Sequence, residues 1–231
     1  MLNSTQPDLL KLSSNFSKML KKRFGKGPES CLTVLNKGRL YIFIRNFITP
    51  AEEVLIENEE WELANHFRSA VFDSVIQEFI TKASKVLEID FKYFFHDWNY
   101  SSNTGLVFLE HLHVDEEKVI LDSQSNRFLK VVEEIGLQLH KKPEEIRIFM
   151  NTHNMCGIEI IGIQTHLETL LFKNGNSHFL QQHLTHIKQG YLKHKKQLES
   201  ILNYSVDDVF VMCDYERNRY VLFLIFSKKV I

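Results

Sequence analysis

The chain repeats one order of segments, and this repeat limits its fold more than any other feature. A segment that runs from about Phe16 to Glu110 returns about 115 positions later, from about Phe128 to Phe226. Three short anchors keep their order in both copies: residues 28–32 with 143–147, 49–52 with 165–168, and 106–109 with 221–224. A period of this length exceeds the units of solenoids and approaches a small domain. We therefore predict two homologous tandem domains that arose by duplication.

The composition favours a folded protein with enough apolar material for two cores. Of the 231 residues, 44% are hydrophobic and 18 are Phe, whereas only 4 are Pro and 9 are Gly. The repeat divides this material between two domains of roughly 100 residues each, close to the lower limit for an independent core. The formal net charge of −1 provides no global attraction to nucleic acid, so we expect no nucleic-acid partner.

The cysteines and the hydropathy pattern favour the cytoplasm. Cys31, Cys156 and Cys213 form no CxxC pair, and their odd number in apolar surroundings predicts reduced, packed thiols. Residues 1–16 contain no apolar stretch after a basic region, so we predict no signal peptide. The longest apolar run, from Tyr220 to Phe226, is far shorter than the ~20 residues of a spanning helix. We expect a cytoplasmic protein that meets a membrane only at its surface.

The first half predicts the order helix, hairpin, two helices, hairpin. Apolar residues at helical spacing predict an opening helix that ends at Gly25, and strands over 31–35 and 40–44 follow. Thr49 as N-cap, Pro50 at the first helical position and Glu52 at the third predict a short helix to about Glu57. A long amphipathic helix over 61–87 precedes a hairpin of 91–98 with 104–110. We expect Trp61 in the core and Trp98 at the surface beside a turn.

The second half predicts the same order with different residues. Helices are expected over 128–139 and 177–202, and hairpins over 146–150 with 157–162 and over 206–213 with 219–226. The polar stretch 113–125 reads as a linker between a first repeat at 1–112 and a second, divergent repeat at 126–231. The predicted class is α+β, each domain a small antiparallel sheet of two hairpins with a long helix and shorter helices packed on it. We expect the two copies to form an internal pseudo-dimer.

Several of these residues together resemble a known family. They are Gly25, Lys26, Gly27 and Pro28 after a basic helix, Thr49, Pro50, Ala51 and Glu52 after the hairpin, Arg68 in the long helix, and Val107, Phe108 and Leu109 at the end. This set resembles the MpsC-type family, small bacterial proteins with a domain of unknown function, linked by name to a sodium-translocating, membrane-potential-generating system. The usual family protein is a single copy. The second repeat departs from the pattern, with residues 139–143 in place of the glycine–proline motif and His166 in place of the proline.

A basic helix end is the strongest candidate for binding. Five cations, Lys18, Lys21, Lys22, Arg23 and Lys26, fall within nine positions beside two glycines, and they could bind a phosphate, an anionic lipid surface or an acidic partner face. The alternative is a solvated helix face whose cations suit the helix dipole. The candidate binding residues are Lys21, Lys22, Arg23, Gly25, Lys26, Gly27, Pro28, Thr49, Glu52 and Arg68. The glycines, Pro50 and Glu52 also have a plain structural explanation as helix-ending and helix-starting residues.

Motifs for catalysis are missing from the sequence. It contains no GxxxxGK followed by Ser or Thr, no GxSxG, and no cysteine in a basic setting, so we predict neither an enzyme nor a cofactor. His178, His183, His186 and His194 lie on or beside the second long helix. His183 and His186 are one turn apart, but no nearby acid or cysteine completes a zinc site, and a polar helix surface is the preferred interpretation.

The resemblance implies a non-enzymatic cytoplasmic accessory protein of a membrane cation or bicarbonate translocation system. Its partner would be an integral membrane transporter or an anionic membrane surface. One alternative is a ligand-sensing regulatory domain with its site between the two copies. Another is an enzyme of unrecognised type, which is considered because the chain contains many histidines.

Overall fold

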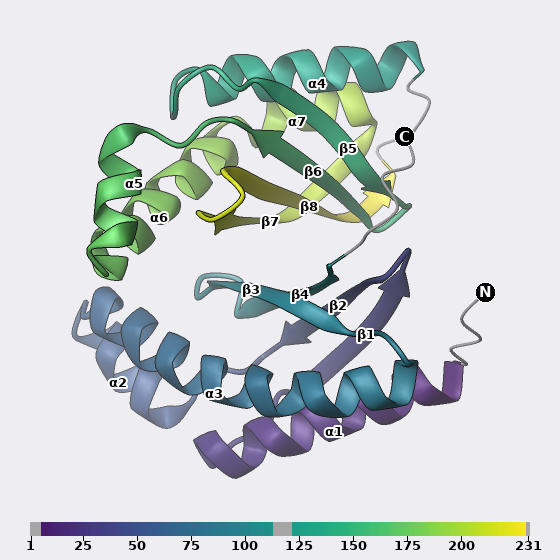
Figure 1. Cartoon of the computed structure of the whole chain (residues 1–231), viewed down its shortest axis with the longest axis vertical. Coiled ribbons are helices and arrows are strands. Elements are labelled where there is room, and N and C mark those ends of the chain that lie inside the picture. The colour runs from purple at the N-terminus through teal and green to yellow at the C-terminus, as the bar shows by residue number, and fades with distance from the viewer. Residues whose placement is uncertain (1–5, 113–121, 230–231) are drawn as a thin grey trace. The chain divides into compact units, whose positions relative to one another are not determined.

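The chain folds into two compact units, each a four-stranded antiparallel sheet covered by helices. The computed structural model describes residues 6–112 and 122–229 (Figure 1). The units comprise Met1–Asp115 and Glu116–Ile231. Within the described residues there are seven helices and eight strands, which confirms the predicted α+β class.

In unit 1 the sheet has the strand order β1-β2-β4-β3. The elements in chain order are α1 (Gln6–Phe24), β1 (Ser30–Asn36), β2 (Arg39–Arg45), α2 (Pro50–Glu57), α3 (Trp61–Leu87), β3 (Phe91–Asn99) and β4 (Thr104–His111). Positive φ at Lys37 and Gly38 allows the two-residue turn between β1 and β2. The end of α1 and the bounds of the other six elements lie within a residue or two of those predicted, because each is set by a strong local signal.

Helices α1 and α3 cover one face of this sheet (Figure 1). Their apolar stripes meet the alternate residues of β2 and β4 in one core, which includes Leu12, Phe16, Leu20, Ile42, Ile44, Phe72, Val75, Phe79, Val107 and Leu109. Phe16 and Phe79 contact edge to face, with ring centroids 4.8 Å apart. Burying each such side chain contributes about 1.5–3 kcal/mol, so this face supplies most of the stability of unit 1.

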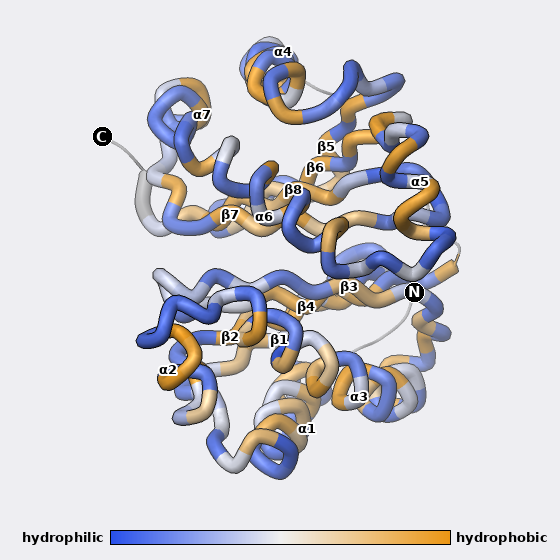
Figure 2. The backbone as a smooth tube through the Cα atoms, turned by 90° about the vertical axis from the view of Figure 1, so that its left-hand side faces the viewer, coloured by the Kyte–Doolittle hydropathy of each residue, from blue (hydrophilic) through white to orange (hydrophobic). Residues whose placement is uncertain are grey.

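Unit 2 has the strand order β5-β6-β8-β7, which is the same topology. Its elements are α4 (Ser123–Gly136), β5 (Glu145–Asn151), β6 (Met155–Ile161), α5 (His166–Lys173), α6 (Ser177–Lys193), α7 (Lys195–Leu202), β7 (Tyr204–Asp214) and β8 (Arg219–Lys229). The core joins one face of the sheet to α4, α6 and α7 through Phe128, Val132, Ile158, Ile187, Leu198, Val209, Leu222 and Leu224. Hydrophobic and hydrophilic residues alternate along α1, α3 and α4, as expected for helices with one buried side (Figure 2).

The two units also share a hydrogen bond that does not depend on the hydrophobic pattern. Asn103 and Asn218 both have positive φ in the turn of the last hairpin. The side chain of Asn103 accepts a hydrogen bond from the backbone of Phe47 at 2.8 Å, and Asn218 accepts one from Gln164 at 2.8 Å. These equivalent bonds tie the last hairpin of each unit to the loop before its short helix.

Two predicted boundaries in the second half are wrong. Helix α4 begins at Ser123 and not at Phe128, because Asp122 caps it by accepting a hydrogen bond from the Ser125 backbone at 2.7 Å. The predicted linker therefore ends too late, and its residues 113–121 lie outside the described residues. The helix expected over 177–202 is interrupted at His194, whose Nδ1 lies 2.9 Å from the carbonyl oxygen of Gly190.

Both tryptophan placements are also wrong. Trp98 is 7% exposed and packs in the core, whereas Trp61 is 44% exposed. Trp98 is buried because its partner across the hairpin is Gly105, which leaves room for the indole ring over β4. A Cβ on Gly105 would lie 1.9 Å from Cε3 of Trp98.

Gly105→Ala is expected to destabilise unit 1 by about 2–3 kcal/mol, since the indole must move out of a packed core. Urea unfolding followed by tryptophan fluorescence measures this, because Trp61 and Trp98 both lie in unit 1. Gly25→Ala is the control: Gly25 has φ +77° but no atom within 4 Å of an added Cβ. It should cost only about 1 kcal/mol. Equal midpoints for the two variants would contradict the close packing.

Candidate functional site

Most residues of the family-like motif gather at one end of unit 1, whereas Val107, Phe108 and Leu109 lie within β4. The end of α1, the loop before α2, the start of α2, the first half of α3 and the end of β3 meet at this end of the unit. We call the buried part the Arg68 corner and define it as Arg68, Thr49, Glu52, Phe24, Phe47, Phe72, Trp98 and Tyr100. The exposed cations Lys18, Lys21, Lys22, Arg23 and Lys26 are the basic helix end.

The first layer of the corner is a capping box at the start of α2. The Thr49 hydroxyl accepts the backbone N–H of Glu52 at 3.4 Å, and the backbone N–H and hydroxyl of Thr49 donate to Glu52 Oε2 at 2.8 and 2.7 Å. Pro50 begins the helix without losing a hydrogen bond, because the first N–H of a helix has no partner within it. This local chemistry places the Glu52 carboxylate, which is 0% exposed, against α3.

Arg68 neutralises that buried carboxylate. Its Nη2 donates to Glu52 Oε2 at 2.6 Å and to the carbonyl oxygen of Phe47 at 2.8 Å, and the side chain is 2% exposed. The pair therefore joins α3 to α2 and to the preceding loop. Among the described residues, Nε and Nη1 of Arg68 and Oε1 of Glu52 have no hydrogen-bond partner.

Aromatic rings surround the rest of the guanidinium. The Arg68 Cζ atom lies 3.8 Å from the ring centroid of Trp98, and four more rings follow at 5.2 to 6.0 Å: Phe47, Tyr100, Phe72 and Phe24. Cation–π contact in a desolvated setting offsets part of the cost of burying the charge. Burial raises the pKa of Tyr100 to about 12 despite the nearby arginine, so the phenol stays neutral at physiological pH.

The corner also holds the turn that follows α1. Phe24 contacts the rings of Phe47 and Phe72 at 5.2 and 5.7 Å, and Gly25 with φ +77° ends the helix directly after it. Lys26 donates through Nζ to the carbonyl oxygen of Ile48 at 2.8 Å. The end of α1 is thus fixed by the packing of the Phe24 ring in the corner and by the exposed hydrogen bond of Lys26.

The basic helix end is exposed to solvent. Arg23 lies 3.8 Å from Glu78 and Lys26 lies 3.9 Å from Glu53, both in exposed pairs that are worth little. Lys18, Lys21 and Lys22 make no ion pair with any described residue. These three positions, spaced by three and four, form one stripe opposite the buried side of α1.

The predicted binding residues therefore divide into two groups. Thr49, Glu52 and Arg68 are buried and hold the corner together. The exposed members are Lys21, Lys22, Arg23, Gly25 and Lys26, whereas Gly27 and Pro28 are half-buried. Sequence reasoning missed the five aromatic rings of the corner, because they come from four separate segments and no local pattern links them.

Unit 2 has a different buried cluster around the equivalent carboxylate. Glu168 closes a capping box with Thr165, whose N–H and hydroxyl donate to its Oε2 at 2.7 and 2.6 Å. Its Oε1 accepts from the Tyr220 hydroxyl and lies 3.4 Å from Nε2 of His183. Burial alone would raise the pKa of Glu168, but hydrogen bonds from His183, Thr165 and Tyr220 lower it to about 2. A histidine and a phenol thus stand where unit 1 has an arginine.

The last hairpins explain this exchange by side-chain size. Trp98 faces Gly105 in unit 1, whereas Cys213 faces Tyr220 in unit 2. The large residue has moved to the other strand, and from there its hydroxyl reaches Glu168. Burial raises the pKa of Cys31 and Cys156 to about 12 and that of Cys213 further, so all three thiols stay protonated at neutral pH.

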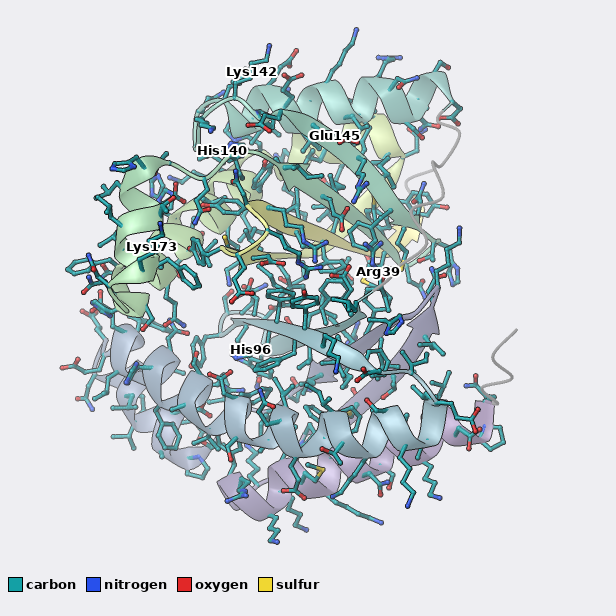
Figure 3. All side chains as sticks on the ribbon, in the orientation of Figure 1. Arg39, His96, His140, Lys142, Glu145 and Lys173 are labelled. Carbon is teal, nitrogen blue, oxygen red and sulfur yellow. The ribbon has the colours of Figure 1, made fainter. Side chains whose placement is uncertain are left out.

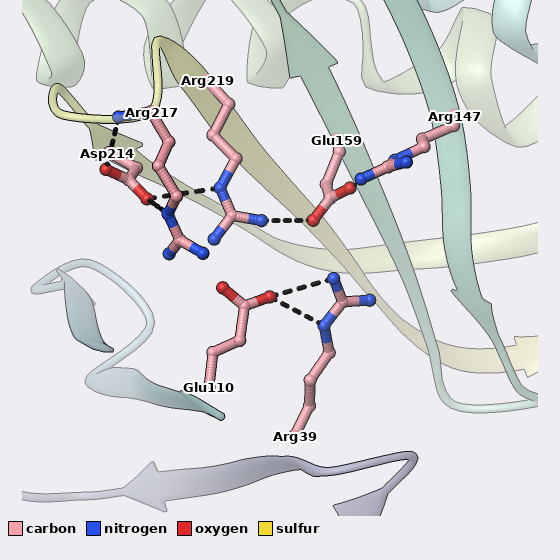
Figure 4. A network of polar contacts seen from close by, with 7 residues as sticks. All are labelled: Arg39, Glu110, Arg147, Glu159, Asp214, Arg217 and Arg219. Atoms are coloured by element: carbon pink, nitrogen blue, oxygen red, sulfur yellow. Dashed lines mark hydrogen bonds and ion pairs between the residues drawn. The ribbon is translucent and has the colours of Figure 1, made fainter. Parts of the chain in front are cut away.

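Each sheet also carries ion pairs on the face opposite its helices (Figure 4). In unit 1, Arg39 bonds Glu110 at 2.9 Å across β2 and β4. In unit 2, Glu159 lies between Arg147, at 2.5 Å, and Arg219. Arg219 and Arg217 both contact Asp214. Each of these charges therefore has a partner of opposite sign within its own sheet.

Two further polar features lie outside the corner. His96 of β3 lies 3.1 Å from Asp73 of α3 at the edge of unit 1 (Figure 3). In unit 2, a groove of about 600 Å³ between α4 and the start of β5 is lined by charged residues that include Lys130, Lys142 and Glu145. Among the described residues, no group of three His, Cys, Asp or Glu side chains could hold a metal ion. No helix of the described part is long and apolar enough to cross a membrane.

The fold and the corner define an α+β protein of two units with one topology. Among the described residues, unit 1 has an arginine on the buried carboxylate of its capping box and cations in the last turn of its first helix, and unit 2 has neither. A family model described as "Na+-translocating membrane potential-generating system (MpsC)" matches residues 10–110, which include the whole Arg68 corner. Unit 1 is therefore similar to the MpsC family, as its motif residues predicted. No curated protein and no solved structure matches the chain.

Arg68→Met should destabilise unit 1 by about 3–5 kcal/mol, because it leaves the Glu52 carboxylate buried without a cation. Arg68→Met with Glu52→Gln should recover part of that loss, since no buried charge remains. Tryptophan fluorescence during urea unfolding measures both. Arg23→Met, which breaks the exposed pair with Glu78, is the control and should cost at most about 1 kcal/mol. A loss of that small size for Arg68→Met would contradict the importance of the pair.

Unit 2 should lose stability in acid through Glu168. The pKa of this group falls from 4.5 to about 2 on folding, so its stabilising contribution is complete above pH 4.5 and disappears as the pH falls towards 2. The stability difference between the native chain and Glu168→Gln should therefore shrink between pH 5 and pH 2.5. Hydrogen exchange of β8 peptides in a urea series measures it, with the exposed Glu134→Gln as control. A difference independent of pH would contradict the assignment.

Proposed function

We propose that the chain is a non-enzymatic accessory protein that binds an integral membrane protein of a cation-translocating system. The observation that carries this proposal is the match of residues 10–110 to the MpsC family model. The buried Arg68 corner supports a binding role over a catalytic one, because its charged groups are enclosed by rings and cannot reach a substrate in this conformation. The proposed location is the cytoplasmic side of the membrane.

The basic helix end is the proposed contact face. Helix α1 has Lys21, Lys22 and Arg23 in its last turn, whereas α4 of unit 2 has no basic residue there. The feature is thus confined to the unit that matches the family. Solvated cations on a helix suit an acidic surface of a partner, where they increase the association rate and select the orientation.

Unit 2 is proposed to be a divergent copy of unit 1. The common strand order, the two capping boxes and the equivalent Asn103 and Asn218 bonds support a duplication. The absence of cations in the last turn of α4 and of an arginine on Glu168 supports a separate role for this copy. We propose that unit 1 contacts the membrane partner and that unit 2 does not.

Affinity purification from gently solubilised native cells, followed by mass spectrometry, tests the proposal. The tagged native chain should enrich an integral membrane protein. The variant Lys18→Gln/Lys21→Gln/Lys22→Gln should enrich it about tenfold less, because three rim charges of a few tenths to 1 kcal/mol each are lost. The control Lys11→Gln/Lys85→Gln/Lys92→Gln removes the same charge from other exposed positions of unit 1 and should behave as the native chain. If the native chain enriches no membrane protein, the accessory role is wrong.

A further inference from the structure

An apolar surface adjoins the basic helix end, and no assigned role accounts for it. Phe67 and Leu63 of α3 are 39% and 51% exposed and lie one helical turn apart. The Phe67 ring contacts Phe24 edge to face at 6.0 Å, and Phe24 directly follows the cations of the last turn of α1. The end of α1 lies beside the first half of α3, on the side away from the sheet (Figure 1).

The part of this surface that α1 contributes is basic. Glu53 lies near Lys26, and Glu78 lies near both Arg23 and Lys82. The hydrogen bond from Lys82 and, more weakly, the charges of Arg23 and Lys22 lower the pKa of Glu78, whereas Lys18, Lys21 and Lys22 form no ion pair with a described residue. An exposed ring and an exposed leucine near solvated lysines match the two layers of an anionic bilayer, the acyl boundary and the charged headgroups.

The surface is also rigid. Phe24 is held by the rings of Phe47 and Phe72, and the Arg68–Glu52 pair fixes the elements from which these rings project. A surface that is already ordered loses little side-chain entropy when it meets a membrane. Transfer of the Phe67 ring from water to the acyl boundary therefore requires no rearrangement of the surface.

We propose that the basic helix end, together with Phe67 and Leu63, forms a contact face for the surface of an anionic lipid bilayer. The inference deepens the proposed function and rests on it for the presence of a membrane. In this contact the lysines bind lipid phosphates and the ring of Phe67 enters the headgroup boundary, so the face binds lipid and not protein alone. The contact is peripheral and reversible, and it brings unit 1 to the membrane that holds its partner.

Sedimentation of the full chain with protein-free vesicles tests this face. Vesicles that contain phosphatidylglycerol should bind the native chain, and pure phosphatidylcholine vesicles should not. Because each lysine near an anionic surface contributes a factor of about five, Lys18→Gln/Lys21→Gln/Lys22→Gln should bind about 100-fold more weakly. Lys11→Gln/Lys85→Gln/Lys92→Gln should bind as the native chain, and 0.5 M salt should abolish binding, at a Debye length of about 4 Å.

Two further variants test the apolar part of the contact face. Phe67→Ser should weaken vesicle binding about fivefold at any content of phosphatidylglycerol, and Leu63→Ser serves the same purpose should Phe67→Ser fail to fold. Absence of binding to anionic vesicles, or equal binding by the two lysine variants, would overturn the inference. Either result leaves the proposed function standing if a membrane protein is still enriched in detergent, and the basic helix end would then contact protein and not lipid.

Discussion

The buried ion pair between Arg68 and Glu52 is the interaction on which the rest of unit 1 depends. Two charges removed from water are costly, and the pair persists because each partner has a second reason for its position. Glu52 completes the capping box of α2, and Arg68 stacks on Trp98 while it bonds the Phe47 carbonyl. One guanidinium therefore connects five segments, which include the end of α1 through Phe24.

The two units stabilise one topology with different buried chemistry. Unit 1 places the Arg68 guanidinium on its capping-box carboxylate, whereas unit 2 places the His183 ring and the Tyr220 hydroxyl on Glu168. The change required compensation in the last hairpin, where the pair Trp98 and Gly105 is matched by Cys213 and Tyr220. Close packing explains this coupling: the ring can lie on either strand if the residue opposite is small, but two rings cannot occupy the same space.

The fold alone assigns no activity, because one architecture can carry many functions. What distinguishes unit 1 is its surface beside the Arg68 corner. The corner holds the end of α1, where the lysines lie on the side opposite the buried residues and Phe24 contacts the exposed Phe67 ring. Unit 2 keeps the scaffold without these cations, and for this reason the membrane contact is proposed for unit 1 and not for unit 2.

The sequence by itself determined the α+β class, the bounds of most elements of unit 1 and the capping box of Thr49 and Glu52, since each rests on contacts between residues that are close in the chain. The same local reasoning failed where distant segments compete. It placed Phe128 at the start of α4 and missed the cap at Asp122, it joined α6 to α7, and it exchanged the environments of Trp61 and Trp98. Only the tertiary structure decided that Arg68 and Glu52 are buried partners and that five rings enclose them. Helical spacing shows which residues share a face, but it contains no information on which ring, from which other segment, will cover that face.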